Sequence, residues 1–218
     1  MEKAKLTIAQ KIQLVISLVL RVSLLIGAGG ALYLGAWITL FLAIFAFVLT
    51  FLPAFFSRNS RVLLPTEMEF TFVLFIYASI FLGTTHGFYE RYWWWDVALH
   101  GVSGFTLGFI GFILLFVLYS GERIKASAFT IAFFSFCFAV AVGVMWEILE
   151  FTLDSFLHTA HKLQLSLSDT MWDLIMDATG ALVTSIFGYL YVKHDKENFV
   201  TIFLENFIKK NPGLFRNS

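Results

Sequence analysis

The stretch Trp93-Trp94-Trp95-Asp96-Val97-Ala98-Leu99-His100-Gly101-Val102-Ser103 opens a long apolar segment that continues to Tyr119. A helix of this length can cross the hydrocarbon core of a membrane, which is about 30 Å thick. Within the segment, Asp96, His100 and Ser103 follow one another at spacings of four and three, so they share one helical face. We therefore expect a membrane-spanning helix with a polar stripe at one end.

The composition of the whole chain is that of an integral membrane protein. Of its 218 residues, 59% are hydrophobic, 27 are Phe and only 14% are charged, and the mean hydropathy is +0.81. A soluble domain has roughly 25% charged residues, so a soluble enzyme is excluded and no nucleic-acid partner is expected. Apolar segments long enough to span a bilayer predict an all-α bundle of six transmembrane helices over residues 12–28, 36–56, 70–85, 96–119, 129–154 and 169–192.

Two stretches interrupt the first half of this pattern. Gly27-Ala28-Gly29-Gly30 is expected to separate the first two spans, and the second span is expected to break after Leu52-Pro53. The chain has no Ser/Pro-rich linker and no internal repeat, which favours one six-helix domain over residues 1–192. The remaining residues, 193–218, form a tail in which residues 198–210 have the pattern of an amphipathic helix on the cytoplasmic surface.

The distribution of Lys and Arg predicts the orientation. Arg91 and Lys162 fall in loops on one side of the predicted bundle, and twelve basic residues fall on the other side. Cytoplasmic loops carry the excess of Lys and Arg, so we expect a cell-membrane protein with both termini in the cytoplasm. The twelve residues are Lys3, Lys5, Lys11, Arg58, Arg61, Arg123, Lys125, Lys193, Lys196, Lys209, Lys210 and Arg216.

Acidic residues are concentrated at one end of the last three spans. In the predicted topology these span ends all face the exterior. A charge at the membrane centre costs about 2.5–3.5 kcal/mol, so the acidic faces are expected to turn inward around a pocket roughly 10 Å below the outer rim. Seven of the 15 acidic residues belong to this set: Asp96, Glu147, Glu150, Asp154, Asp169, Asp173 and Asp177.

So many carboxylates in one pocket require neutralisation, either by shared protons or by a bound divalent metal ion. Carboxylates alone would suit Ca²⁺ or Mg²⁺, whereas the imidazole of His100 shifts the preference towards Zn²⁺, Mn²⁺ or Fe²⁺. The identity of the metal stays open. The predicted ligands are Asp96, His100, Glu147, Glu150, Asp173 and Asp177.

Other polar residues are candidates for further roles. Glu150 is a candidate general base, and Arg21 in the first span is a candidate for binding an anionic substrate group or for a structural ion pair. Asp154 and Asp169 are candidates for substrate binding at the rim, although Asp169 could instead interact with the dipole of its helix. The loop over residues 155–168 could form a lid over the pocket.

The run from Phe88 to Gly104, with Trp146-Glu147-Ile148-Leu149-Glu150 and the segment from Asp169 to Ala181, resembles the YjdF-like family of multi-pass inner-membrane proteins. It is also distantly similar to VanZ-like proteins. The YjdF-like family is a domain of unknown function, so the resemblance implies the fold and the acidic site without implying a reaction.

A shorter stretch, Gly101-Val102-Ser103-Gly104, is similar to the serine motif of rhomboid intramembrane proteases. That likeness implies Ser103 as a catalytic nucleophile. The rhomboid pattern places a histidine base on the sixth helix, however, and this chain has Asp177-Ala178-Thr179-Gly180 there.

The sequence therefore leaves several functions open. The first is a metal-dependent hydrolase or transferase that acts on a lipid-like substrate from the surrounding membrane lipids. The second is a transporter coupled to protons or to another cation. A rhomboid-like serine protease and a metal-stabilised accessory protein without turnover are further alternatives. The oligomeric state is not predicted.

Overall fold

The computed structural model describes residues 7–60, 62–157, 166–194 and 199–215, and all regular elements within these ranges are helical. The expected all-α fold is confirmed. Six helices are long and apolar enough to cross a membrane, as the sequence predicted, and their bounds exceed the predicted spans by a few residues at most ends. They are Ile8–Tyr33, Trp37–Ser60, Thr66–Thr85, Trp94–Ser120, Ala128–Phe156 and Leu167–His194.

The chain divides into two compact units, one of Met1–Trp93 with Lys209–Asn211, the other of Trp94–Ile208 with Pro212–Ser218. The two units separate between the third and fourth spans, and the expected domain boundary at residue 192 stays a prediction. The first unit contains α1 (Ile8–Tyr33), α2 (Trp37–Leu49), α3 (Leu52–Ser60), α4 (Thr66–Ile76), the π-helix η1 (Tyr77–Thr85) and α5 (Phe88–Arg91). The second contains α6 (Trp94–Ser120), α7 (Ala128–Leu157), α8 (Leu167–His194), most of α9 (Phe199–Lys210) and α10 (Pro212–Phe215).

In the first unit, α1 continues through the glycine-rich stretch that was expected to end it. An interrupted helix would expose backbone polar groups to lipid, where nothing can bond them. Gly27 is instead a packing position, because a Cβ atom there would lie 2.7 Å from the ring of Phe81. The chain turns further on, at Gly35, whose φ of +68° favours glycine.

The second span breaks before Pro53, and the prediction of a break after it was wrong. The helical pattern is interrupted at Thr50 and Phe51, and Pro53 lies in the first turn of α3. A proline is tolerated in the first turn of a helix because its missing N–H would have no partner there.

Arg21 binds the end of α2. Its Nε donates to Thr50 Oγ1 at 3.1 Å, its Nη2 donates to the Thr50 carbonyl at 2.9 Å, and its guanidinium lies 4.6 Å from the ring centroid of Phe51. These contacts lie within the first unit, and through them Arg21 joins α1 to the end of α2. A role in substrate binding stays a prediction.

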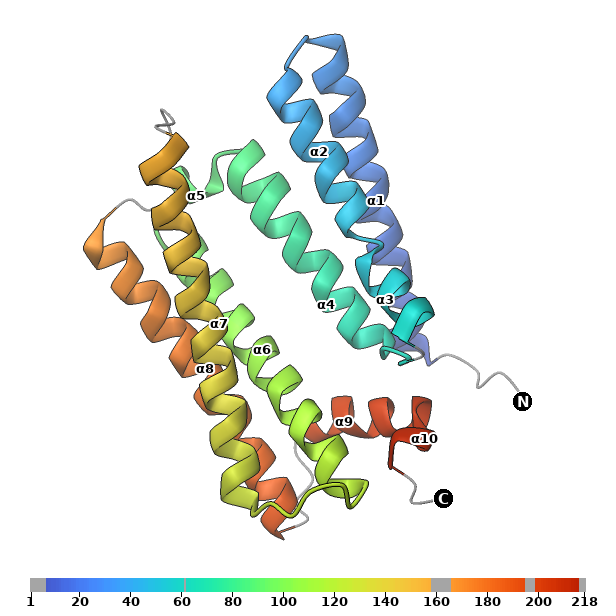
Figure 1. Cartoon of the computed structure of the whole chain (residues 1–218). Helices are drawn as coiled ribbons and strands as arrows, with labels where there is room; N and C mark the ends of the chain where they lie inside the picture. Colours follow the sequence, from blue (N-terminus) through green and yellow to red (C-terminus); the bar gives the residue numbers. More distant parts are fainter. Residues whose placement is uncertain (1–6, 61, 158–165, 195–198, 216–218) are drawn as a thin grey trace. The chain divides into compact units, whose positions relative to one another are not determined.

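The second unit is built on three long helices, in which α6 and α8 run in the same direction and α7 runs antiparallel to both. Figure 1 shows α6, α7 and α8 side by side, with the start of α6, the end of α7 and the start of α8 at the same end. This arrangement brings the acidic ends of the three helices together. The α6 and α8 backbones are in close contact, because a Cβ atom at Gly104 would overlap the backbone of Asp177 and one at Gly180 would overlap the backbone of Gly101. Small residues permit such an approach between membrane helices.

Hydroxyl groups join the same three helices below the acidic end. Ser135 Oγ donates to the Gly108 carbonyl at 2.7 Å, and Thr184 Oγ1 donates to the Phe105 carbonyl at 2.9 Å. Ser185 Oγ lies 3.2 Å from Ser135 Oγ. Interhelical hydrogen bonds of this kind hold helices together in a membrane, where the hydrophobic effect between helices is absent.

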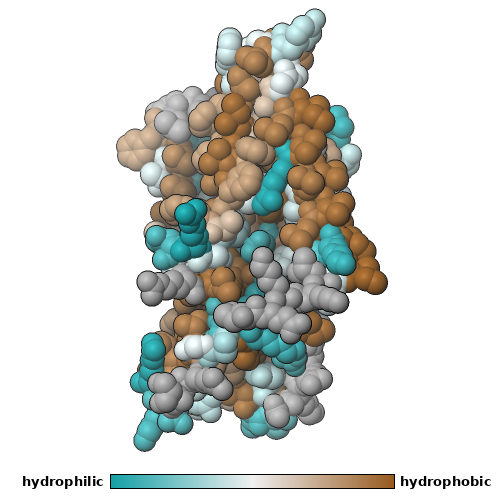
Figure 2. Space-filling view, turned by 90° about the vertical axis from the view of Figure 1, so that its right-hand side faces the viewer, coloured by the Kyte–Doolittle hydropathy of each residue, from teal (hydrophilic) through white to brown (hydrophobic). Residues whose placement is uncertain are grey.

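The surface has the apolar character of a protein in lipid. Large hydrophobic side chains such as Phe41, Phe133 and Ile186 are exposed. Figure 2 shows hydrophobic residues over broad areas of the face it draws, with scattered hydrophilic residues between them. Exposed apolar areas of this extent mark a surface that is covered by lipid or by another protein.

The close contact between α6 and α8 predicts the effect of enlarging its glycine. Gly104→Ala should destabilise the protein by about 1–3 kcal/mol, because the new methyl group meets backbone atoms that cannot rotate away. The measurement is the thermal unfolding midpoint of the purified protein in detergent. Gly30→Ala is the matched control, because nothing lies within 4 Å of a Cβ atom at Gly30. An equal midpoint for the two variants would contradict the role given to Gly104.

Candidate functional site

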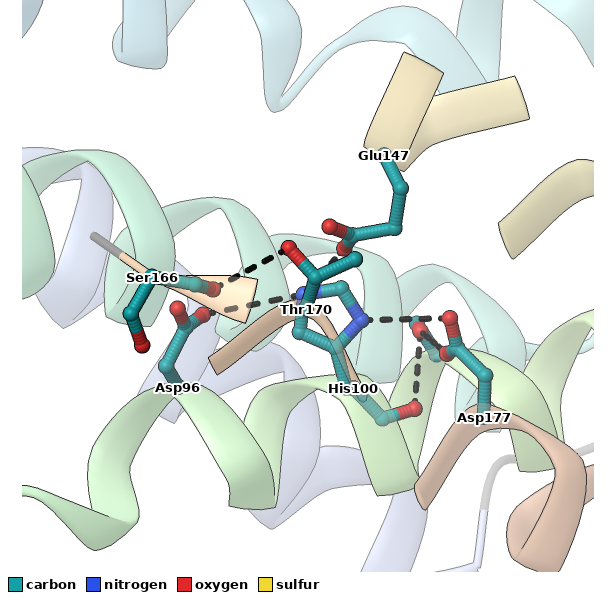
Figure 3. Close-up of polar contacts among 7 residues, drawn as sticks. Asp96, His100, Glu147, Ser166, Thr170 and Asp177 are labelled. Atoms are coloured by element: carbon teal, nitrogen blue, oxygen red, sulfur yellow. Dashed lines mark hydrogen bonds and ion pairs between the residues drawn. The ribbon is translucent and has the colours of Figure 1, made fainter. Parts of the chain in front are cut away.

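Four titratable side chains from three helices are buried together at the acidic end of the second unit. His100 on α6 is 7% exposed, Glu147 on α7 is 5% exposed, and Asp173 and Asp177 on α8 are 3% and 2% exposed. Asp96, one turn before His100, joins them and is partly exposed. The structure therefore brings together five of the six predicted metal ligands, and Figure 3 shows Asp96, Glu147 and Asp177 around the imidazole of His100.

The two nitrogens of His100 have different surroundings. Nδ1 lies 3.1 Å from Asp177 Oδ2, which is hydrogen-bonding distance. Nε2 lies 3.7 Å from Asp96 Oδ1 and 3.8 Å from Glu147 Oε1, which is beyond a good hydrogen bond. One nitrogen is therefore engaged by a carboxylate, while the other faces two carboxylates across a wider gap.

Asp96, His100 and Asp173 each offer one ligand atom, and these three atoms lie within 4.8 Å of one another. Asp173 Oδ1 is buried and has no hydrogen-bond partner among the residues that the structure describes. Burying a carboxylate oxygen without a partner is unfavourable by several kcal/mol or more. The side chain of Asp96 is 33% exposed, so the group is accessible from the Asp96 side.

Asp177 contacts α6 through both of its carboxylate oxygens, and its predicted role as a metal ligand stays a prediction. It contacts His100 through Nδ1, and its other oxygen, Oδ1, accepts a hydrogen bond of 2.7 Å from Ser103. It is not part of the group formed by Asp96, His100 and Asp173. Equal spacing along α8 predicted that Asp173 and Asp177 share a face, but spacing does not determine which nitrogen of the imidazole each carboxylate meets.

The surroundings of Ser103 differ from those of a serine nucleophile. In a Ser-His-Asp triad the imidazole lies between the hydroxyl and the carboxylate and removes the proton of the hydroxyl. Here Asp177 lies between Ser103 and His100, and the Ser103 hydroxyl also lies 2.8 Å from the His100 carbonyl. The catalytic role of Ser103 stays a prediction that this arrangement does not favour.

The remaining predicted site residues lie around this cluster. Glu150, one turn beyond Glu147 on α7, interacts electrostatically with Glu147, Asp96 and His100. Asp169, near the start of α8, interacts in the same way with Asp96 and Asp173. Asp154 is partly buried near the end of α7. The roles of Asp154 and Asp169 in substrate binding stay predictions.

The sequence did not single out two residues that shape the cluster. Gly143 on α7 leaves space for Asp177, because a Cβ atom at this position would overlap the carboxylate. Ser166 caps α8, since its Oγ accepts from the Asp169 N–H at 3.1 Å. The Ser166 carbonyl also accepts from Thr170 Oγ1 at 3.4 Å, as Figure 3 shows. The spacing of Ser166 and Asp169 is that of a helix-capping pair, which could have located the start of α8.

The expected lid over residues 155–168 falls largely outside the described residues. Ser155 and Phe156 belong to α7, and α8 begins at Leu167. Residues 158–165 are not described, so the proposal of a lid stays a prediction.

The fold and the cluster define a class: a multi-pass helical membrane protein with a buried imidazole surrounded by carboxylates. Residues 12–194 match the family described as "Predicted membrane protein (DUF2238)", and the chain belongs to this family. The match confirms the resemblance to an uncharacterised family of multi-pass membrane proteins that the sequence motifs indicated. The distant similarity to VanZ-like proteins is not shown by it.

A relative from Thermotoga maritima, described as an uncharacterised protein, is 34% identical over 111 residues. This match covers 49% of the present chain and 56% of the relative, so it spans little more than half the length of the curated protein. No solved structure matches the chain.

The position of Ser103 predicts the result of active-site labelling. We expect a fluorophosphonate probe to leave Ser103 unmodified, because its hydroxyl donates to the Asp177 carboxylate and not to an imidazole, the base that activates the serine of a Ser-His-Asp triad. The measurement is intact-protein mass spectrometry after incubation, with Ser103→Ala as the matched control. Stoichiometric labelling of the wild type that disappears in Ser103→Ala would contradict this reading and support the rhomboid-like alternative.

Proposed function

We propose that the protein binds a divalent metal ion through Asp96, His100 and Asp173, with Glu147 beside them, and that it is a metal-dependent hydrolase or transferase acting on a lipid-like substrate. The observation that carries the proposal is Asp173, which offers one of the three candidate ligand atoms and has a buried oxygen, Oδ1, without a hydrogen-bond partner among the described residues. A cation at this place would neutralise the carboxylates and replace the missing partner.

The donor atoms favour certain metals. One imidazole nitrogen combined with carboxylate oxygens suits Zn²⁺, Mn²⁺ or Fe²⁺, whereas Ca²⁺ and Mg²⁺ prefer oxygen ligands alone. His100 is close to Asp96 and Glu147 at separations of 3.7 and 3.8 Å, and two ligands that each lie about 2.0–2.2 Å from a metal ion can be this far apart.

The surroundings of the cluster support chemistry on a membrane lipid. A divalent cation bound there would polarise a phosphoryl or acyl oxygen and make a water molecule more acidic. Glu150, one turn from Glu147 and in electrostatic interaction with it, would accept the proton of that water. The exposed side chains of Trp146 and Trp172 lie on the same helical segments, and exposed Trp residues at span ends are typical of the level of the lipid headgroups.

The continuity of the helices favours this proposal over the transporter. Transport sites in membranes are typically formed by discontinuous helices whose ends point at the substrate. In this chain α6, α7 and α8 each run as unbroken α-helix past the cluster.

Elemental analysis tests the metal site. We expect stoichiometric metal in the wild-type protein after loading with Zn²⁺ or Mn²⁺, and loss of that metal in Asp173→Asn combined with Glu147→Gln, because two of the proposed oxygen donors lose their charge. Glu122→Gln is the matched control, since it removes an acidic charge from the turn that follows the other end of α6. Equal metal content in all three proteins, or none in the wild type, would refute the site.

The proposed base gives a separate prediction. Glu150→Gln should retain the bound metal and reduce turnover by about 10²–10⁴-fold, because removal of a general base affects the chemical step. The assay is mass-spectrometric detection of released headgroup, fatty acid or lysolipid from phospholipid vesicles that contain the metal-loaded protein. A metal-loaded wild type that releases no product from such vesicles, but carries the metal ion across them, would refute the enzyme and favour the transporter.

A further inference from the structure

Asp177 uses both of its carboxylate oxygens to bind α6. Oδ2 lies 3.1 Å from His100 Nδ1, and Oδ1 accepts the hydrogen bond of 2.7 Å from Ser103 Oγ. His100 and Ser103 are three residues apart on one face of α6, so a single carboxylate of α8 reaches both. Since an ionised carboxylate accepts hydrogen bonds and does not donate them, an ionised Asp177 requires the proton of its hydrogen bond with His100 to lie on Nδ1.

We infer that Asp177 is a positioning residue, which holds the His100 ring with its proton on Nδ1 and thereby presents the lone pair of Nε2 to the cation. The inference rests on the proposed metal site. Neutral imidazole has one N–H and one free lone pair, and the hydrogen bond at one nitrogen determines which nitrogen can bind a metal. Nε2 is the nitrogen that faces Asp96 and Glu147.

Close packing against α6 and α7 fixes the position of Asp177. A Cβ atom at Gly143 of α7 would overlap Oδ2 and lie 3.0 Å from Cγ. A Cβ atom at Gly104 of α6 would overlap the backbone of Asp177 itself. Because both positions are glycine, the two helices lie close against Asp177, which is only 2% exposed. It therefore has little freedom to turn away from the imidazole, and the orientation of the ring is set before a cation binds.

The arrangement predicts that Asp177 affects metal affinity without supplying a ligand atom. Replacement of such an orienting group lowers metal affinity typically by 10–100-fold. In Asp177→Asn, the amide nitrogen can donate to Nδ1, which would leave the proton on Nε2 and block the metal-binding nitrogen.

The experiment compares Zn²⁺ affinity in the wild type, Asp177→Asn and Thr184→Val by competition with a chromophoric chelator. Asp177→Asn should bind Zn²⁺ 10–100-fold more weakly. Thr184→Val is the matched control, because it removes another hydrogen bond between α8 and α6, seven residues away, and should keep the wild-type affinity. Equal affinity of wild type and Asp177→Asn overturns the inference and leaves the metal site intact. Equal weakening in both variants also overturns it, since the effect would then be structural.

A measurement on the wild type needs no variant to fold. In protein labelled with ¹⁵N-histidine and loaded with Zn²⁺, the His100 ring should retain a proton on Nδ1 and carry the metal on Nε2, with His100→Gln used to assign the signals. Metal bound at Nδ1 overturns the inference alone. A wild type without bound Zn²⁺ overturns the proposed metal site, and the inference with it.

Discussion

The close contact between α6 and α8 is the constraint on which the rest of the second unit depends. Glycines on both helices meet the backbone of the partner, Gly104 against Asp177 and Gly180 against Gly101. This contact sets how far the two helices are shifted along each other. The shift places His100 and Ser103 opposite Asp177, so the same glycines that pack the helices also determine the geometry of the polar cluster.

The cluster opposes this packing electrostatically. Carboxylates from three helices surround one imidazole in the interior of the unit, and each loses part of its hydration there. The helices remain together because the segments below the cluster are joined by small-residue packing and by hydroxyl groups such as Ser135 and Thr184. The segments below the cluster therefore stabilise the packing of the three helices, and the polar end can contain side chains that oppose it.

The sequence predicted what depends on composition and on spacing within one helix. The six spans followed from hydropathy, and the acidic stripes followed from the helical period, because both are properties of single segments. Predictions that depended on a partner were less successful. Gly27 was expected to end a helix, but the ring of Phe81 lies against it, and the break near Pro53 fell on the other side of the proline. Gly143 and Ser135 contact neighbouring helices, and the residue pattern of a single helix carries no information about such contacts.

Asp173 and Asp177 show, within the site, the same limit of prediction from spacing along one helix. They lie one turn apart on one face of α8, and for a pattern of spacing they are equivalent. The imidazole between the helices is not symmetrical, however, since one nitrogen carries a proton when the other offers a lone pair. Asp177 meets Nδ1 and Ser103, whereas Asp173 joins Asp96 and His100 in the group of candidate ligand atoms. Two like residues at helical spacing can thus have different partners, because one turn of α8 is enough to bring one carboxylate to Nδ1 of the histidine ring and to leave an oxygen of the other without a hydrogen-bond partner among the described residues.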